Sequence, residues 1–272
     1  MKILEEMMYS VVIPAYNCEK TIVPALESVR NQTRFDLVNE IILINDGSLD
    51  ATNTVILDYI FKNPNMNIRY FSQENKGVSY TRNRGIRLAK SDWIALLDSD
   101  DLWLPHKLER QHSELQKNGK IKFIGSTFPL KILWKKRTGL CKLTPKELCL
   151  RSMPATPSVI FNKKVGLDLG LFKEDMGYCE DINFFQKFLL LDSYYVLAEN
   201  LITINVGKNY HGAFGLSSNL DDMHQGRHQN VKELYKLGLI SKPFMYLIFF
   251  FNTLKLLRRK SILLFNQLKE GR

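Results

Sequence analysis

This 272-residue sequence lacks paired-cysteine motifs and the glycine-rich motifs that bind phosphate groups. Its four cysteines show no C-x-x-C spacing, which excludes a zinc ribbon and a disulfide scaffold and makes a reducing, cytoplasmic setting the expectation. No G-x-G-x-x-G follows the first predicted strand, and no G-x-x-x-x-G-K-[ST] occurs, so neither a dinucleotide fingerprint nor a P-loop is present. Phosphate groups, if the protein binds any, are held by another device.

Long apolar runs are also missing. The longest uncharged stretch near the C-terminus, Pro243 to Leu254, has 12 residues, whereas a membrane-spanning helix needs about 20. The first residues, "MKILEEMMYSVVIP", place two glutamates ahead of an apolar run and offer no small-residue cleavage site. We therefore expect a first strand there and not a secretory signal.

Positive charge is abundant but unevenly placed. The net charge is +10, and residues 236–272 hold eight basic side chains against one acidic side chain. The sequence before this tail contains no repeat and no low-complexity linker. We therefore expect one domain over residues 1–235 and a basic amphipathic helical extension over residues 236–272.

Strand-like and helix-like patterns alternate through the first hundred residues. The apolar runs are "SVVIP", "EIILIND", "IRYFSQ" and "WIALLD", and helical patterns occupy residues 19–30, 50–62 and 78–90. This rhythm predicts an α/β fold with a mostly parallel, doubly wound sheet. Polar segments follow each run, namely "PAYN", "NDGS", "QENKG" and "DSDD". Because parallel strands share a carboxyl edge, these segments are expected to meet in one ligand-binding crevice.

The last of these segments, "DSDD", has three aspartates in four positions. If the strand continues to its tip, Asp98 and Asp100 leave the same face and Asp101 points the other way. Two neighbouring carboxylates repel unless a cation lies between them, and oxygen ligands suit Mg²⁺ or Mn²⁺. The alternative is a polar turn that closes the strand and caps the next helix.

Several segments, in order, resemble the family 2 glycosyltransferases, which have the nucleotide-diphospho-sugar transferase (GT-A) fold. The matching segments are "SVVIPAYNCEKTI", "LINDGSLDAT", "NKGVSYTRNRGIRLAKSDWIALLDSDDLWLPHKLERQ", "TPSVIFNKK" and "CEDINFFQKF". Together they cover residues 9 to about 215. The family's Q-x-x-R-W motif, found in its processive members, is absent, which favours addition of one sugar per encounter.

The resemblance assigns the crevice to a nucleotide sugar. It implies that Asp46 accepts a hydrogen bond from a uracil ring N–H and that Asp98 contacts the ribose or sugar. Asp100 would hold the Mn²⁺ or Mg²⁺ ion that bridges the two phosphates. The full set implied for nucleotide-sugar binding is Pro14, Ala15, Tyr16, Asp46, Asn83, Asp98, Ser99 and Asp100. Asp98, Asp101 and His211 are further candidates for the metal site, although His211 can also be an ordinary loop residue.

The pair Glu180 and Asp181 matches the family's "ED" motif, whose aspartate is the catalytic base. Spacing alone leaves open whether Asp181 instead caps the helix that begins there. The resemblance thus implies metal-dependent, inverting transfer of one hexosyl or N-acetylhexosaminyl group from a nucleotide sugar, expected to be UDP-linked. The acceptor would be a hydroxyl of a glycan or lipid-linked sugar, as in bacterial-type surface polysaccharide or glycolipid synthesis.

Two other functions compete with this one. A non-catalytic nucleotide-binding protein on the same fold would not need the aspartates at 98, 100 and 181, all of which are present. A nucleotidyltransferase usually has a glycine-rich basic loop after the first strand, whereas "PAYNCEKT" contains no glycine.

The tail at residues 242–269 has its own alternatives. Its mixture of apolar and basic residues favours a helix lying on the cytoplasmic face of an anionic membrane. A hairpin packed on the catalytic domain and a homodimer interface are the other possibilities. Nucleic acid is not expected as a partner, because bulky aliphatic residues separate the basic ones.

Overall fold

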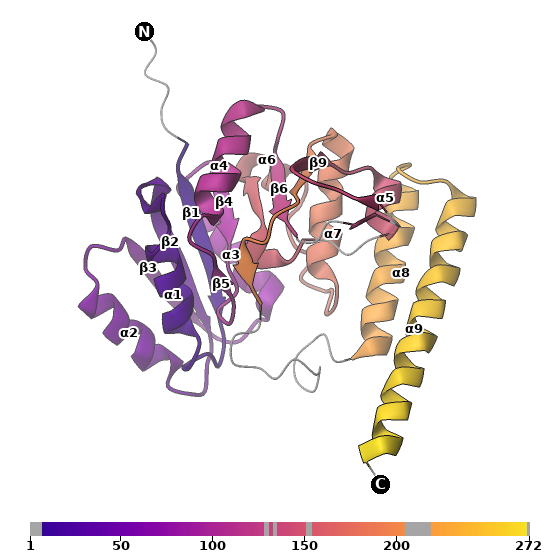
Figure 1. The fold of residues 1–272 in the computed structure, drawn as a ribbon. Coiled ribbons are helices and arrows are strands. Elements are labelled where there is room, and N and C mark those ends of the chain that lie inside the picture. The colour runs from indigo at the N-terminus through magenta and orange to yellow at the C-terminus, as the bar shows by residue number, and fades with distance from the viewer. Residues whose placement is uncertain (1–6, 128–130, 133–134, 151–153, 205–218, 271–272) are drawn as a thin grey trace.

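The computed structural model describes residues 7–127, 131–132, 135–150, 154–204 and 219–270. The first hundred residues alternate strands and helices, as predicted (Figure 1). In chain order they are β1 (Tyr9–Ala15), α1 (Ile22–Arg30), β2 (Val38–Asp46), α2 (Thr52–Lys62), β3 (Ile68–Gln73), α3 (Val78–Leu88) and β4 (Trp93–Leu96).

Shorter elements follow, and the described chain ends in two long helices. The strands are β5 (Leu102–Trp103), β6 (Phe123–Ser126), β7 (Lys131–Ile132), β8 (Lys135–Lys136), β9 (Leu140–Lys142), β10 (Ile160–Asn162), β11 (Tyr194–Leu197) and β12 (Ile202–Thr203). The helices are α4 (Lys107–Lys117), α5 (Pro145–Leu150), α6 (Lys163–Asp168), α7 (Glu180–Gln186), α8 (Leu220–Lys236) and α9 (Lys242–Glu270).

One eight-stranded sheet organises the described part of the chain, in the order β3-β2-β1-β4-β10-β6-β11-β9. Strands β1 to β4 pair in parallel, as do β6 and β11, whereas β10 and β9 run antiparallel to their neighbours. The prediction of a mostly parallel α/β sheet is confirmed. The antiparallel strands of this sheet, β9 and β10, come from the second half of the chain.

Both faces of the sheet are buried, which explains the continuous apolar runs of its strands. On β1, Val11 joins the core formed with α1, α2 and α4, while the adjacent Val12 joins the opposite core formed with α3, α7, α8 and α9. Successive side chains of a strand point to opposite faces, so a strand covered on both sides needs apolar residues at consecutive positions.

The acidic segment after β4 differs from the extended strand considered for it. Strand β4 ends at Leu96, and the N–H of Asp101 donates to the carbonyl of Asp98 over 3.1 Å. This hydrogen bond closes a turn, so the alternation of strand side chains does not apply to Asp98 and Asp100. The expectation that they leave the same face of a strand is therefore wrong, and the turn alternative describes the backbone.

The C-terminal helices form a hairpin at one end of the molecule, where α9 runs alongside α8 (Figure 1). Met245 and Ile248 of α9 are buried in the same core as Val231 and Leu234 of α8. The N-terminal half of α9 is thus packed on the rest of the protein. No helix within the described ranges combines the length and apolarity needed to cross a bilayer.

Helix α3 lies close to the sheet because Gly85 has no side chain. A Cβ at this position would lie 2.5 Å from Val12 Cγ1, in the packed core. We predict that Gly85→Val lowers the free energy of unfolding by about 1–3 kcal/mol, the usual cost of overpacking a core. Chemical denaturation measures this.

The matched control is Gly119→Val, because a Cβ there meets nothing within 4 Å and the backbone is not left-handed. Equal stability of the two variants would contradict the close contact between α3 and β1.

Candidate active site

A large cleft opens at the carboxyl edge of the parallel strands, with a volume of about 1070 Å³. Segments following β1, β2, β3 and β4 all line it, as the order of elements predicts. Most of the residues expected to bind a nucleotide sugar lie in its wall. They are Pro14, Ala15, Tyr16, Asp46, Asp98, Ser99 and Asp100.

The segment after β1 is held by hydrogen bonds to the segment after β2. The Asn17 side chain accepts from the N–H of Leu49 over 2.8 Å, and the Asn17 N–H donates to the Ser48 hydroxyl over 3.0 Å. Asn17 has a left-handed backbone with φ of 46°. The adjacent Tyr16 is 47% exposed and lines the cleft, so its ring is available to a planar ligand group.

Asp46 is buried in the cleft wall, and it organises the segment after β3. One carboxylate oxygen accepts hydrogen bonds from Gln73 Nε2 and the Lys76 N–H, and the other accepts from the Gly77 N–H over 2.9 Å. A carboxylate offers about four acceptor positions, so these three bonds leave about one for a ligand. The preceding residue, Asn45, is a structural side chain, bonded to the Ser48 N–H and the Tyr70 hydroxyl.

The turn after β4 carries the predicted metal-site aspartates. Asp98 and Asp100 line the cleft, whereas Asp101 is only 4% exposed and is not part of its wall. Among the described residues no three histidine, cysteine or acidic side chains gather as a metal site. His211 lies outside the described residues.

Asn83 also lies away from the cleft wall. Its side chain is 2% exposed and bonds the backbone N–H and C=O of Phe172 and the carboxylate of Glu174. Glu174 does line the cleft. Asn83 therefore connects α3 to the segment that carries Glu174, and it lies behind the cleft wall, although it was expected to bind the nucleotide sugar.

Arg82 on α3 is the central side chain that the sequence analysis missed. Its guanidinium donates to Asp98 over 2.7 Å and to Glu180 over 3.0 Å, and it is 6% exposed. It therefore joins the acidic turn to the start of α7. A signal for it was present, because three acidic motif residues, at 98, 180 and 181, required a cation and the segment "TRNRG" supplies two arginines.

Helix α7 begins at Glu180, directly after Cys179, whose backbone is left-handed with φ of 59°. Cys179 occupies the position before the helix, so Asp181 is not its N-cap residue. Asp181 does accept a hydrogen bond from the Ile182 N–H over 2.7 Å, one of the unpaired donors of the first turn. The side chain is thus held by its own helix without being the residue that caps it.

Burial raises the pKa of the Asp181 carboxyl above its ordinary value, and the negative charge of Asp98 adds to this effect. The Ile182 N–H and the Arg82 guanidinium act in the opposite direction and favour the carboxylate. A partly buried aspartate with a raised pKa is a better proton acceptor than a fully solvated one.

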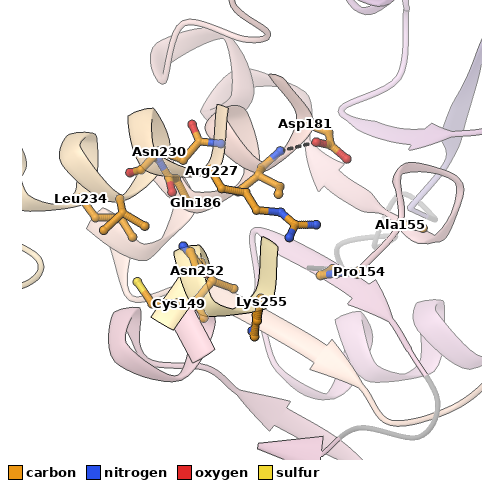
Figure 2. A pocket seen from close by; sticks show the side chains of 13 residues that line it. Cys149, Pro154, Ala155, Asp181, Gln186, Arg227, Asn230, Leu234, Asn252 and Lys255 are labelled. Carbon is orange, nitrogen blue, oxygen red and sulfur yellow. Dashed lines mark hydrogen bonds between the residues drawn. The ribbon is translucent and has the colours of Figure 1, made fainter. Parts of the chain in front are cut away.

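Asp181 faces a second, smaller cavity of about 190 Å³, which is lined by parts of α5, α7, α8 and α9 (Figure 2). Its neighbour Glu180 instead pairs with Arg82, which lines the large cleft. Two adjacent acidic residues therefore serve two cavities, and the start of α7 forms a common boundary between them.

Comparison with known proteins identifies the family. Residues 10–138 match the profile described as "Glycosyl transferase family 2". An uncharacterized glycosyltransferase of Rickettsia typhi is 31% identical over 217 residues, covering 73% of this chain and 64% of the relative. Chondroitin synthase of Escherichia coli is 39% identical over 111 residues, covering 41% of this chain and 16% of the relative. The chain thus spans only part of the length of these relatives.

Among solved structures, TarS residues 1–349 from S. aureus in complex with UDP-GlcNAc superimposes with a TM-score of 0.68 at 20% identity. The match covers 89% of this chain and 70% of that chain. This similarity shows that the chain has the GT-A fold. Helices α8 and α9 form a helical C-terminal extension of it. The residues at 10–138 belong to glycosyl transferase family 2, as the collinear motifs of the sequence indicate.

Proposed function

We propose that this protein transfers one sugar from a nucleotide-diphosphate sugar to an acceptor hydroxyl, with inversion at the anomeric carbon. The observation that carries this proposal is the boundary at Glu180 and Asp181. The large cleft lies on the Arg82 side of this boundary, and the smaller cavity lies on the Asp181 side. A transferase needs such an arrangement, with donor and acceptor meeting at one base.

The donor proposed for the large cleft is a UDP-sugar with a hexosyl or N-acetylhexosaminyl group. Tyr16, with Pro14 and Ala15, would cradle the base, and Asp46 retains acceptor capacity for a uracil N–H. Asp98 and Ser99 would contact the ribose or sugar. The complex of TarS with UDP-GlcNAc supports a donor of this chemistry on this fold.

The residues of the acidic turn fit a divalent cation. Asp98 and Asp100 offer only oxygen donors at the cleft surface, which suit Mg²⁺ or Mn²⁺, and two carboxylates leave coordination positions for phosphate oxygens. Asp100 would be the main ligand, with Asp98 beside it. When bound, the ion would stabilise negative charge on the departing diphosphate. Asp101 is buried outside the cleft wall, so we leave it out of the ligand set.

The protein's own groups account for the remaining steps. Asp181 accepts the proton of the acceptor hydroxyl as its oxygen attacks the anomeric carbon. The bond from that carbon to the diphosphate breaks, and the nucleoside diphosphate leaves with the electron pair. Arg82 holds Asp98 and Glu180 in place beside the reacting groups. No covalent sugar intermediate is needed for inversion.

We predict that Asp181→Asn lowers kcat by about 10²–10⁴-fold, the usual contribution of a general base, while UDP affinity changes little. The amide keeps the side chain's shape and can still accept from the Ile182 N–H. The measurement is a screen of nucleotide sugars for transfer or hydrolysis, followed by steady-state kinetics on the active donor and by UDP titration.

The control is Asp168→Asn, a surface aspartate on α6 paired with Lys164.

The pH dependence of the wild type gives a second check. As the pH is lowered, kcat should begin to fall at a pH above the ordinary aspartate range, because the base must be deprotonated and the pKa of Asp181 is raised. Parallel loss of UDP binding and turnover would make Asp181 a structural residue. UDP binding by the wild type with no turnover on any donor would instead favour the non-catalytic alternative.

We predict that Asp100→Ala removes the increase in UDP affinity that Mn²⁺ or Mg²⁺ gives the wild type. The ion loses a protein ligand and can no longer join the phosphates to the cleft. Titration of UDP with metal and with excess chelator measures this directly. Asp92→Ala is the control, since Asp92 is exposed and precedes β4 at its other end. A wild type that binds UDP and turns over equally well in chelator would refute the metal requirement.

We further propose that the extension at residues 242–269 contacts an anionic membrane surface, which would bring a lipid-linked or glycan acceptor to the enzyme. Large apolar side chains stay exposed on α9, including Leu247, Phe250 and Leu254 at 58%, 64% and 47%. Their spacing of three and four residues places them on one side of the helix. Basic residues 258–260 follow within the next turns.

We predict that Leu247→Ser/Phe250→Ser/Leu254→Ser loses flotation with phosphatidylglycerol-containing vesicles that bind the wild type. Each near-surface basic residue contributes about 1 kcal/mol, but the apolar contact is needed as well. Substitution is preferable to truncation, because Met245 and Ile248 of α9 belong to the core. The matched control is Leu49→Ser/Leu57→Ser/Phe61→Ser, which removes exposed apolar side chains elsewhere. If the wild type instead forms a dimer without vesicles, and only the variant at residues 247, 250 and 254 loses this dimer, the exposed side of α9 is a homodimer interface.

A further inference from the structure

Two cationic side chains line the small cavity beside Asp181 and have no role in the donor cleft. They are Arg227 from α8 and Lys255 from α9. Figure 2 shows the Arg227 guanidinium extending into the space between Asp181 and Pro154, with Lys255 on the α9 side. Within the described part of the chain, no carboxylate forms an ion pair with either of them.

The packing of α8 fixes Arg227 relative to the proposed base. Gly226, next to Arg227, lies so close to the segment before α7 that a Cβ would approach the Tyr178 carbonyl to 2.6 Å. One turn later, the Asn230 side chain donates to the Cys179 carbonyl over 2.9 Å and accepts from Asn183 over 2.8 Å. The helix that carries Arg227 is therefore attached to the residues on both sides of Asp181.

Lys255 reaches the cavity from the C-terminal extension. Its ammonium group lies 4.2 Å from the centre of the Phe251 ring. Burial lowers the pKa of Lys255, and the positive charges of Arg227 and Arg259 lower it further. Two cations held near each other in a partly desolvated site are unfavourable without an anion, and a bound anionic group would offset that cost.

We propose that this cavity binds an anionic group of the acceptor, a phosphate or a carboxylate, through Arg227 and Lys255, with the acceptor hydroxyl at Asp181. The acceptor class is then a polyol phosphate or an acidic sugar and not a neutral glycan. This rests on the proposed transfer function. A volume of about 190 Å³ holds a group of several atoms, since a single water needs only about 10–15 Å³.

The proposal leaves the transfer step unchanged. The hydroxyl oxygen forms the new bond to the anomeric carbon, its proton goes to Asp181, and the nucleoside diphosphate leaves with the electron pair. The anionic group takes no part in these bond changes. Its ion pairs position the hydroxyl, and such charge-assisted contacts are the stronger kind of hydrogen bond.

The test is a titration of the full-length protein, saturated with UDP, by ligand-observed NMR. The probes are glycerol 3-phosphate and glucuronate, each compared with its neutral counterpart, glycerol or glucose. We expect at least one anionic probe to bind about 10- to 100-fold more tightly than its counterpart, the range expected for hydrogen bonds to charged groups. The arm that binds distinguishes a phosphate from a carboxylate acceptor.

Arg227→Gln and Lys255→Gln should each remove most of this preference, while Arg227→Lys should keep part of it because the charge remains. Lys232→Gln, an exposed cation of α8 outside the cavity, should behave as wild type. All variants should bind UDP normally, because neither cation lines the donor cleft, and this also confirms that they are folded.

Equal binding of anionic and neutral probes, or an unchanged preference in Arg227→Gln and Lys255→Gln, would overturn the proposal. Both results would leave UDP binding and the donor screen intact. Failure of the transfer function itself would appear in that screen and in the UDP titration, independently of the probes.

Discussion

The buried guanidinium of Arg82 is the interaction on which the candidate active site depends. Three acidic side chains, at positions 98, 180 and 181, are brought to one region by two separate segments, the turn after β4 and the start of α7, and carboxylates so placed repel. Arg82 offsets this by pairing with both Asp98 and Glu180, and their negative charges raise the pKa of the guanidinium further. Removing one partner of such a buried network leaves the remaining charges uncompensated. The positions of Asp98 and Glu180 therefore both depend on Arg82.

This network also decides how the two acidic residues of α7 divide their tasks. Because Glu180 is engaged by Arg82, its carboxylate neutralises a structural cation of the cleft. Among the described residues, the Asp181 side chain accepts its one hydrogen bond from the Ile182 N–H of its own helix, and it faces the other cavity. A base needs acceptor capacity that is not consumed by strong ion pairs, and of the two residues Asp181 is the one that retains it.

The sequence could predict those parts of the fold that depend on local patterns. Apolar runs such as "EIILIND" identified strands buried on both sides, and the polar segments after them identified the shared edge that lines the cleft. The sequence could not predict which distant segments the side chains of one helix contact in the folded protein. Asn83 and Arg82 are adjacent, yet Asn83 turns to the segment at Phe172 and Arg82 turns to the acidic turn. Such outcomes are set by tertiary packing, which one sequence does not display.

The C-terminal extension illustrates the same limit on a larger scale. Its composition indicated an amphipathic helix but not which side would be covered. In the structure one side of α9 packs into the core through Met245 and Ile248, Lys255 lines the small cavity, and Leu247 and Phe250 remain exposed. A helix that both closes the cavity beside Asp181 and exposes an apolar side connects the proposed acceptor site to the proposed membrane contact. The boundary near residue 235 therefore separates a domain of mixed charge from a basic extension. The site proposed at Asp181 uses residues from both parts of the chain.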